Sequence, residues 1–116
     1  MPVIELNVSQ KIDKAKKKRI ADRISEDITL IPGKQQFELM SVIRDDSYIQ
    51  LGDKFIENGA FINMSCFGSA EAQYNERYTL RLFEILKEEL GIDGDDIYMN
   101  LTERKWWGCH GKVITG

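Results

Sequence analysis

The sequence predicts an α/β protein in which two βαβ units form a four-stranded mixed sheet with two helices on one face. The order of strand, helix and strand occurs twice, in a pseudo-repeat that covers residues 2–44 and 60–102. In each unit a helix of crossover length joins two short apolar segments, as parallel neighbours in one sheet require. Right-handed crossovers then bring both helices to the same face. The chain of 116 residues has the usual length of one domain, about 100 to 150 residues, so we expect a single domain over residues 1–116.

The first unit begins with a strand over residues 3–8, where apolar and other side chains alternate as in a half-buried strand. Residues 13–30 form a charged segment whose isoleucines recur at the spacing of a helix that packs along one side. These isoleucines are Ile20, Ile24, Ile28 and Ile31. Pro32 and Gly33 end the helix, and residues 37–44 supply the second strand.

The connection between the units, residues 45–58, contains a short segment at residues 48–51 that we expect to be an edge strand. Residues 60–67 follow with the nearly continuous apolar sequence AFINMSCF. Such a run is typical of a strand that is buried on both faces.

The helix of the second unit is expected to start after Ser69 as its N-cap and to run to Leu90. Gly91 supplies the C-terminal stop, and residues 97–102 alternate as a last strand. The expected apolar face of this helix consists of Thr79, Leu82, Phe83, Leu86 and Leu90.

The face of the sheet opposite the helices is too apolar for bulk solvent and too polar for a dry core. By strand parity it carries Val3, Glu5, Asn7, Phe61, Asn63, Ser65, Phe67, Tyr98 and Asn100. We expect a partner sheet to cover it, and in a chain with one domain the simplest partner is a second copy.

Composition and charge disfavour several classes of function. Sixteen Lys and Arg against nineteen Asp and Glu give a net charge of −3, which does not attract nucleic acid or anionic lipid. No apolar run approaches the length of about 20 residues that a membrane span needs, and the first residues lack the pattern of a secretory leader. We therefore expect a cytoplasmic protein with no nucleic-acid and no membrane partner, while secretion without a signal stays open.

The cysteines and the histidine give no sign of a metal or redox site. Cys66 and Cys109 lie far apart in the sequence, which fits neither a CxxC pair nor a disulfide framework, so both are expected to be reduced. The single histidine, His110, has no neighbouring ligand set with metal spacing and is expected at the surface or an interface. We expect no metal and no cofactor.

Pro2 and Lys34 are the candidate catalytic residues. Removal of Met1 makes Pro2 an N-terminal secondary amine, a base that burial and neighbouring charges adjust. Taken alone, a proline at position two also fits an ordinary chain start. Lys34 follows the helix-ending Pro32 and Gly33 on a loop, where its ammonium either holds a carboxylate or simply faces solvent.

Further candidates lie in the second half of the chain and on the first helix. Tyr98 and Asn100 share a strand face and suit a small polar ligand, although a strand tyrosine also packs at sheet edges. Trp106 and Trp107 form a pocket wall, a subunit contact or part of the core. The basic run at residues 14–19 spreads around its helix, which favours a solvated surface over a nucleic-acid patch.

Four short motifs, taken together in their order and spacing, resemble the tautomerase superfamily and specifically its branch similar to macrophage migration inhibitory factor. They are MPVI at residues 1–4, PGK at 32–34, CFG at 66–68, and LGI at 90–92 leading to DIYMN at 96–100. The resemblance covers almost the whole chain.

The resemblance implies a homotrimer with active sites between adjacent subunits and a cofactor-independent keto–enol tautomerase activity on small 2-keto acids such as phenylpyruvate. It implies that Pro2 is the general acid/base and that Lys34 holds the substrate carboxylate. It further implies that the backbone N–H of Phe67 binds substrate, and that Tyr98 and Asn100 come from the neighbouring subunit.

The sequence departs from the family pattern in the wall of the pocket. Phe37 matches the pocket tyrosine only approximately, because the segment after Lys34 is one residue shorter. Trp107, Cys109 and Ile114 replace a small aliphatic residue, a tryptophan and a phenylalanine, so either the substrate differs or Trp107 rebuilds the wall from another angle. The alternative hypotheses are a cytokine-like trimer that acts by binding a protein partner, and an unrelated βαβ-repeat module that stays monomeric.

Overall fold

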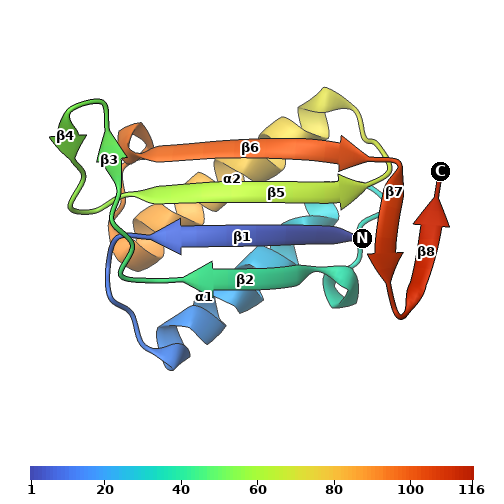
Figure 1. Cartoon of the computed structure of the whole chain (residues 1–116), viewed down its shortest axis with the longest axis horizontal. Coiled ribbons are helices and arrows are strands. Elements are labelled where there is room, and N and C mark those ends of the chain that lie inside the picture. The colour runs from blue at the N-terminus through green and yellow to red at the C-terminus, as the bar shows by residue number, and fades with distance from the viewer.

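The structure is a computed structural model that describes residues 1–116, and it confirms the predicted α/β architecture. Its main sheet has the strand order β2-β1-β5-β6, and two helices cover one face (Figure 1). The pairs β1/β2 and β5/β6 are parallel, whereas β1/β5 is antiparallel, which makes the sheet mixed. The elements are β1 (Pro2–Val8), α1 (Lys14–Glu26), β2 (Met40–Arg44), β5 (Ala60–Phe67), α2 (Ala72–Leu90) and β6 (Ile97–Arg104).

The first helix begins where a side chain caps it. Asp13 accepts a hydrogen bond from the backbone N–H of Lys16 at 2.8 Å and thereby satisfies one of the free donors of the first turn. The regular α-helix ends at Glu26, and the chain continues as a 3-10 turn, Asp27–Leu30. The predicted isoleucine stripe is buried throughout, including Ile28 and Ile31 beyond the α-helix.

The predicted starts of the second strand and of the second helix were wrong, and the last strand extends to Arg104, beyond the predicted residue 102. The second strand starts at Met40 and not at residue 37, because Met40 pairs with Val3 near the start of β1 and the preceding residues have no partner strand. Phe37 lies instead in a 3-10 turn, Gln36–Glu38. Ser69 is not the N-cap of α2: that position is Glu71, whose side chain makes no capping bond.

Tyr78 and Ile85 belong to the buried face of α2, although the predicted stripe omitted them. The hydroxyl of Tyr78 donates a hydrogen bond of 2.7 Å to the carbonyl oxygen of Ile24 on α1. This bond lets a polar group sit in the core and joins the two helices there. Burial also raises the pKa of the Tyr78 phenol well above its ordinary value.

Two small hairpins stand at opposite ends of the sheet (Figure 1). The predicted edge strand is instead part of a separate hairpin, β3 (Gln50–Leu51) and β4 (Lys54–Phe55), since neither strand pairs with the main sheet. The C-terminal segment forms a second hairpin, β7 (Trp106–Cys109) and β8 (Lys112–Thr115), next to the N-terminus. Its turn places His110 in the left-handed region at φ 52°.

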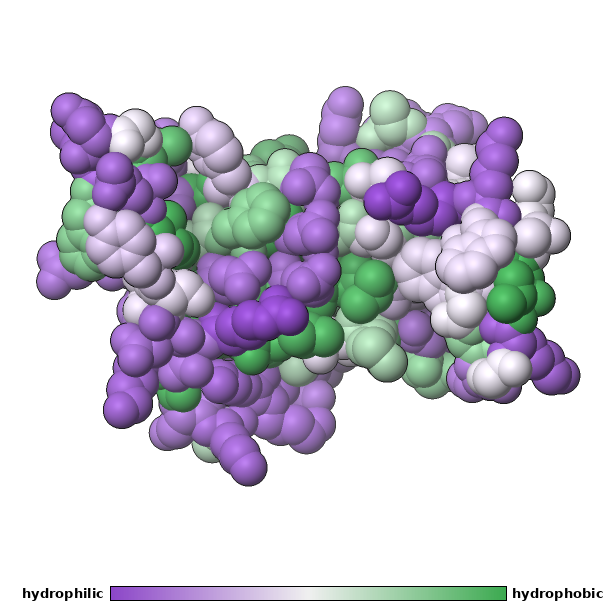
Figure 2. All heavy atoms as spheres, viewed as in Figure 1, coloured by the Kyte–Doolittle hydropathy of each residue, from purple (hydrophilic) through white to green (hydrophobic).

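The core lies between the sheet and the helices, and the opposite sheet face remains uncovered within one chain. Figure 2 shows polar and apolar atoms interleaved over that face. Burial along β5 alternates, so the expectation of a strand buried on both faces is wrong for a single chain. Phe61 is 40% and Tyr98 64% exposed, as the predicted bare face requires. Neither α1 nor α2 contains an apolar stretch long enough for a membrane crossing.

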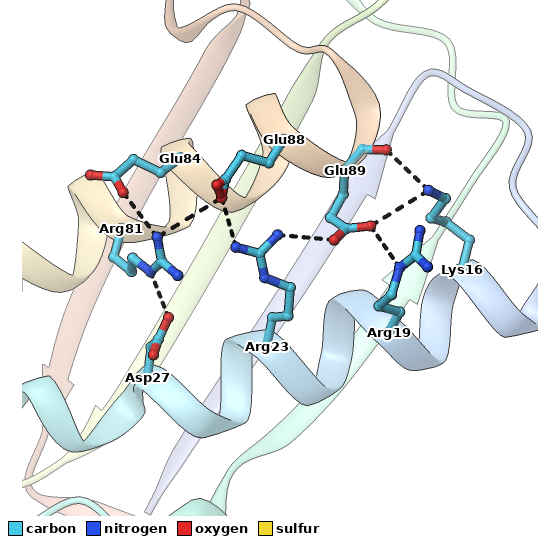
Figure 3. A network of polar contacts seen from close by, with 8 residues as sticks. All are labelled: Lys16, Arg19, Arg23, Asp27, Arg81, Glu84, Glu88 and Glu89. Atoms are coloured by element: carbon cyan, nitrogen blue, oxygen red, sulfur yellow. Dashed lines mark hydrogen bonds and ion pairs between the residues drawn. The ribbon is translucent and has the colours of Figure 1, made fainter.

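A network of ion pairs joins the outer faces of the two helices (Figure 3). Glu89 of α2 accepts hydrogen bonds from Arg19 at 2.9 Å and from Arg23 at 2.9 Å, and Lys16 lies 3.5 Å from it. Glu89 is only 11% exposed. Part of the basic run on the first helix therefore has a specific structural role beyond covering a solvated surface.

Candidate functional site

An open pocket of about 640 Å³ surrounds the N-terminus, between the start of β1, the turn before β2 and the C-terminal hairpin. Three of the predicted site residues, Pro2, Phe37 and Trp107, line it together although they lie far apart in the sequence. The lining residues are Met1, Pro2, Val3, Phe37, Glu38, Leu39, Met40, Trp107, Gly108, Cys109 and His110.

Pro2 is buried and opens β1, where it pairs with Cys66 near the end of β5. A proline fits the first residue of a strand because it lacks the N–H that a ladder position would otherwise use. In the chain with Met1, the nitrogen of Pro2 is a peptide amide and has no basic lone pair.

Met1 occupies the space in front of Pro2 and makes three polar contacts there. Its carbonyl oxygen accepts a hydrogen bond from the N–H of Phe67 at 3.0 Å. Its ammonium nitrogen lies 3.7 Å from Oε2 of Glu38, and its Sδ lies 3.2 Å from Sγ of Cys109. Met1 therefore keeps the Pro2 nitrogen as an amide and also uses the N–H of Phe67.

Lys34 reaches the same end of the sheet from the loop after α1. Its Nζ donates a hydrogen bond of 2.9 Å to the carbonyl oxygen of Phe67. Burial raises the pKa of the neighbouring Cys66 thiol, and the charges of Lys34 and of the N-terminus partly oppose that rise. The positive charges at this end of β5 therefore lie close enough to act on groups beside Pro2.

Phe67 offers backbone groups on one side and its ring on the other. Its N–H and C=O face Met1 and Lys34. Its ring contributes to a second, smaller pocket of about 390 Å³ that Gly116 and residues 103–105 also line.

Tyr98 and Asn100 lie away from Pro2 within one chain. Pro2 pairs with Cys66 and thus stands level with Glu103 on β6, whereas Tyr98 pairs with Phe61. Five positions along a strand correspond to about 16 Å. The structure therefore brings Pro2, Phe37 and Trp107 to one pocket and Lys34 to its edge through Phe67, but leaves Tyr98 and Asn100 toward the other end of the sheet.

Sequence reasoning missed two charged or titratable groups of the pocket. Glu38 was not singled out, because its place on the wall depends on the 3-10 turn before β2. His110 was expected only at the surface or an interface, and its place beside the pocket follows from the tight turn between β7 and β8. Trp106, next to Trp107, points away from the pocket lining and is 64% exposed.

Comparison with known structures supports the fold over nearly the whole chain. The chain is similar to MIF2 from Leishmania major, with 20% sequence identity, a TM-score of 0.89, and coverage of 98% of this chain and 97% of that one. It is similar to Pt0534 inactivated by 2-oxo-3-pentynoate, with 13% identity, a TM-score of 0.82, and coverage of 94% and 93%. A fused 4-OT protein, described as a symmetric trimer, matches with 14% identity, a TM-score of 0.77, and coverage of 88% and 85%. Among curated protein sequences, none matches this chain significantly.

The sequence model of the family described as macrophage migration inhibitory factor (MIF) matches residues 1–115. This match excludes the hypothesis of an unrelated βαβ-repeat module and agrees with the four motifs that suggested the resemblance. By its sequence and by its fold, the chain belongs to the macrophage migration inhibitory factor family.

Proposed function

We propose that this protein is a cofactor-independent keto–enol tautomerase of small 2-keto acids, with phenylpyruvate-type enols as substrates and Pro2 as the general acid/base. The observation that carries the proposal is the position of Pro2, at the start of β1, in a pocket with an aromatic wall and with a lysine beside it. The reaction moves one proton between the enol oxygen and the adjacent carbon, so a single positioned acid/base is sufficient.

Removal of Met1 is the first requirement of this proposal. It converts the amide nitrogen of Pro2 into a secondary amine and empties the space that the Met1 side chain occupies. It also releases the N–H of Phe67, whose acceptor in the intact chain is the Met1 carbonyl oxygen. A single cleavage thus makes available the basic amine of Pro2, the space of the Met1 side chain and the N–H donor of Phe67.

Lys34 supplies the positive charge in this mechanism. Its ammonium lies at the end of β5, 2.9 Å from the Phe67 carbonyl oxygen, and has further donors free for a substrate carboxylate. A nearby cation also favours the unprotonated form of an amine. Phe37 and Trp107 form the apolar wall against which the remainder of the substrate packs.

A homotrimer completes the site in our proposal. The uncovered sheet face and the distance of Tyr98 and Asn100 from Pro2 support it, because a neighbouring subunit can offer these two side chains to the pocket. The fused 4-OT protein of similar fold is a symmetric trimer, and Pt0534 is inactivated by 2-oxo-3-pentynoate. The trimeric state and the inactivation are properties of these two similar proteins, and they support the proposal for this chain.

The test is the ultraviolet decay of enol phenylpyruvate with protein whose intact mass shows that Met1 is absent. We expect fast ketonisation that a Pro2→Gly variant loses by about 10²- to 10⁴-fold, the usual contribution of a positioned acid/base. The variant must first be shown to keep the oligomeric state of the parent. Equal rates for parent and variant would overturn the proposal.

The second candidate function is a trimer that acts by binding a protein partner. The altered wall favours it, since Phe37 is 84% exposed and the resemblance implies that Cys109 replaces a larger aromatic residue. In this case a pull-down recovers the same partner with the parent and with Pro2→Gly. Recovery of no partner by either protein counts against it.

A further inference from the structure

Met1 lies in the pocket in the manner of a bound ligand. Three different parts of this residue, its carbonyl, its ammonium and its thioether, each contact a different group of the wall. The groups that it contacts stay behind when Met1 is removed. The parts of Met1 that these groups contact in the intact chain therefore indicate which chemical groups of a free ligand they can bind after Met1 is removed.

The carbonyl end lies at the edge of the sheet. Its oxygen accepts the Phe67 N–H bond at 3.0 Å, and the ammonium of Lys34 is bonded to the carbonyl oxygen of the same Phe67. A free carboxylate at this place meets a backbone donor and a cation, and the secondary amine of Pro2 stands next to it. The backbone donor and the cation both favour a carboxylate.

The ammonium end faces the carboxylate of Glu38. The nitrogen of Met1 and Oε2 of Glu38 lie 3.7 Å apart, and both side chains are largely covered, at 28% and 24% exposure. A 2-keto acid carries no cation with which Glu38 can pair. Glu38 does complement a ligand that carries an ammonium on the carbon next to the carboxylate.

The side-chain end lies against the C-terminal hairpin. Sδ of Met1 is 3.2 Å from Sγ of Cys109, and Trp107 and Gly108 of the same strand line the pocket. An unbranched apolar chain fits this wall, and a small thiol in place of a large aromatic residue leaves room for it.

The geometry points to a second ligand class for this site: once Met1 is removed, the pocket binds free α-amino acids with an unbranched apolar side chain, of which L-methionine is the prototype. The inference rests on the proposed function only in requiring the pocket that removal of Met1 opens. A free ligand stands farther from Pro2 than the bonded residue does, because a peptide bond of about 1.33 Å becomes a nonbonded contact. The open pocket accommodates that displacement.

Calorimetric titration of protein without Met1 tests the inference with two ligands of the same skeleton. L-Methionine carries the ammonium, and its 2-keto analogue, 4-methylthio-2-oxobutanoate, does not. We expect saturable binding of L-methionine to the parent. In Glu38→Gln we expect binding of L-methionine to weaken by about two- to fivefold, as for a partly exposed ion pair, and binding of the keto acid to tighten because a repulsion is removed.

Two controls make the outcome specific. Glu76→Gln removes the same charge from an exposed position on α2 and should leave both affinities as in the parent. Protein that keeps Met1, made by translation without methionine aminopeptidase, should bind neither ligand because its own residue fills the site. Three results would each overturn the inference. They are no binding of L-methionine to the parent, an equal change in the affinities of both ligands in Glu38→Gln, and binding of either ligand to the form that keeps Met1.

The inference and the proposed function fail separately. The titration requires no turnover, so a protein that binds L-methionine but does not ketonise enol phenylpyruvate supports the inference and refutes the tautomerase. A tautomerase that does not bind L-methionine gives the reverse result.

Discussion

Single residues at the N-terminus determine what the pocket can do. Met1 covers Pro2, holds the N–H of Phe67 and contacts Glu38 and Cys109. Sequence motifs were sufficient to select Pro2, Lys34 and Phe37, because each lies in or beside a short recognisable stretch. Glu38 had no such signal, since its position on the wall arises from a 3-10 turn that the alternation of side chains does not reveal.

Lys34 offers a direct test of carboxylate binding. We predict that Lys34→Gln raises KM for enol phenylpyruvate by about 10- to 150-fold, because a charge-assisted hydrogen bond contributes about 1.5 to 3 kcal/mol. Steady-state kinetics of protein without Met1 measure the effect. The enol of the phenylpyruvate methyl ester lacks the carboxylate, so its KM should change little. An equal rise for both substrates would show that Lys34 only maintains the fold around Phe67.

Tyr78 tests the buried hydrogen bond between the helices. We predict that Tyr78→Phe lowers the free energy of unfolding by about 1 to 2 kcal/mol, because the Ile24 carbonyl loses its partner in the core. Urea unfolding of the parent and the variant measures this change in the free energy of unfolding. The control is Tyr74→Phe, on the more exposed start of α2, which should lie within about 0.5 kcal/mol of the parent. Equal effects of both substitutions would contradict a role for the buried hydroxyl.

At the scale of elements, every strand of the main sheet and both helices were predicted. Side-chain periodicity indicated β1, β6 and the helices, a continuous apolar run indicated β5, and the crossover length indicated β2. The prediction was weaker at the ends of these elements, since boundaries depend on partners that the sequence does not display. Met40 starts β2 because Val3 of β1 is there to pair with it. The N-cap of α2 was misplaced at Ser69 because residues 69–71 approach the helix in an extended path, and the N–H of Ala70 bonds to Glu103 instead.

The two hairpins were missed for a related reason. Their strands contain only two to four residues, which is too short for alternation to give a signal. The hairpin of β7 and β8 nevertheless supplies one whole wall of the pocket. An element that the sequence does not predict thus contributes directly to the site.

The contact between α1 and α2 gives a prediction on pH. Hydrogen bonds from Arg23 and Arg19 hold the pKa of Glu89 below its usual range. As the pH falls, the unfolded chain therefore takes up this proton before the folded one, and the stabilisation present at neutral pH is lost. We predict that Glu89→Gln lowers the free energy of unfolding at pH 7 by about 1 kcal/mol and flattens its decline between about pH 5 and pH 3.

Urea unfolding at a series of pH values measures both quantities. The control is Glu84→Gln, because Glu84 is 63% exposed and pairs only with Arg81 at the edge of the same network. We expect it to change neither quantity noticeably. The free energy of unfolding could also decline with falling pH as steeply in Glu89→Gln as in the parent. This result would show that other carboxylates, such as Asp45 beside Lys17, dominate acid unfolding.

For the whole molecule, the uncovered sheet face predicts self-association. Sedimentation should give three times the protomer mass of 13.4 kDa. Ser65 lies on this face, on the inner strand β5, so Ser65→Arg places a charge where another sheet must pack and is expected to yield a folded monomer. Ser69→Arg, on the exposed loop before α2, should keep the parent mass. A parent that sediments as a monomer would contradict the assembly.

Sequence reasoning predicted this face correctly from strand parity alone, because side chains on a strand alternate strictly. It had no means to show that Tyr98 lies level with Asn7 near the far end of β1, and Asn100 level with Glu5 in the middle of that strand. The positions of Tyr98 and Asn100 relative to Pro2 depend on strand register and not on composition. The register is fixed by pairing between β1, β5 and β6.

The hydrogen bond between Phe67 and Met1 also bears on the order of events after synthesis. In the folded chain Met1 extends the pairing of β1 with β5 by one more bond, and an aminopeptidase acts on chain ends that are locally open. We therefore expect removal of Met1 to be faster while the nascent N-terminus is free than after the sheet has formed, because β5 is synthesised about 60 residues later. On this expectation, the relative timing of cleavage and strand pairing determines which fraction of the molecules carries a free Pro2 amine.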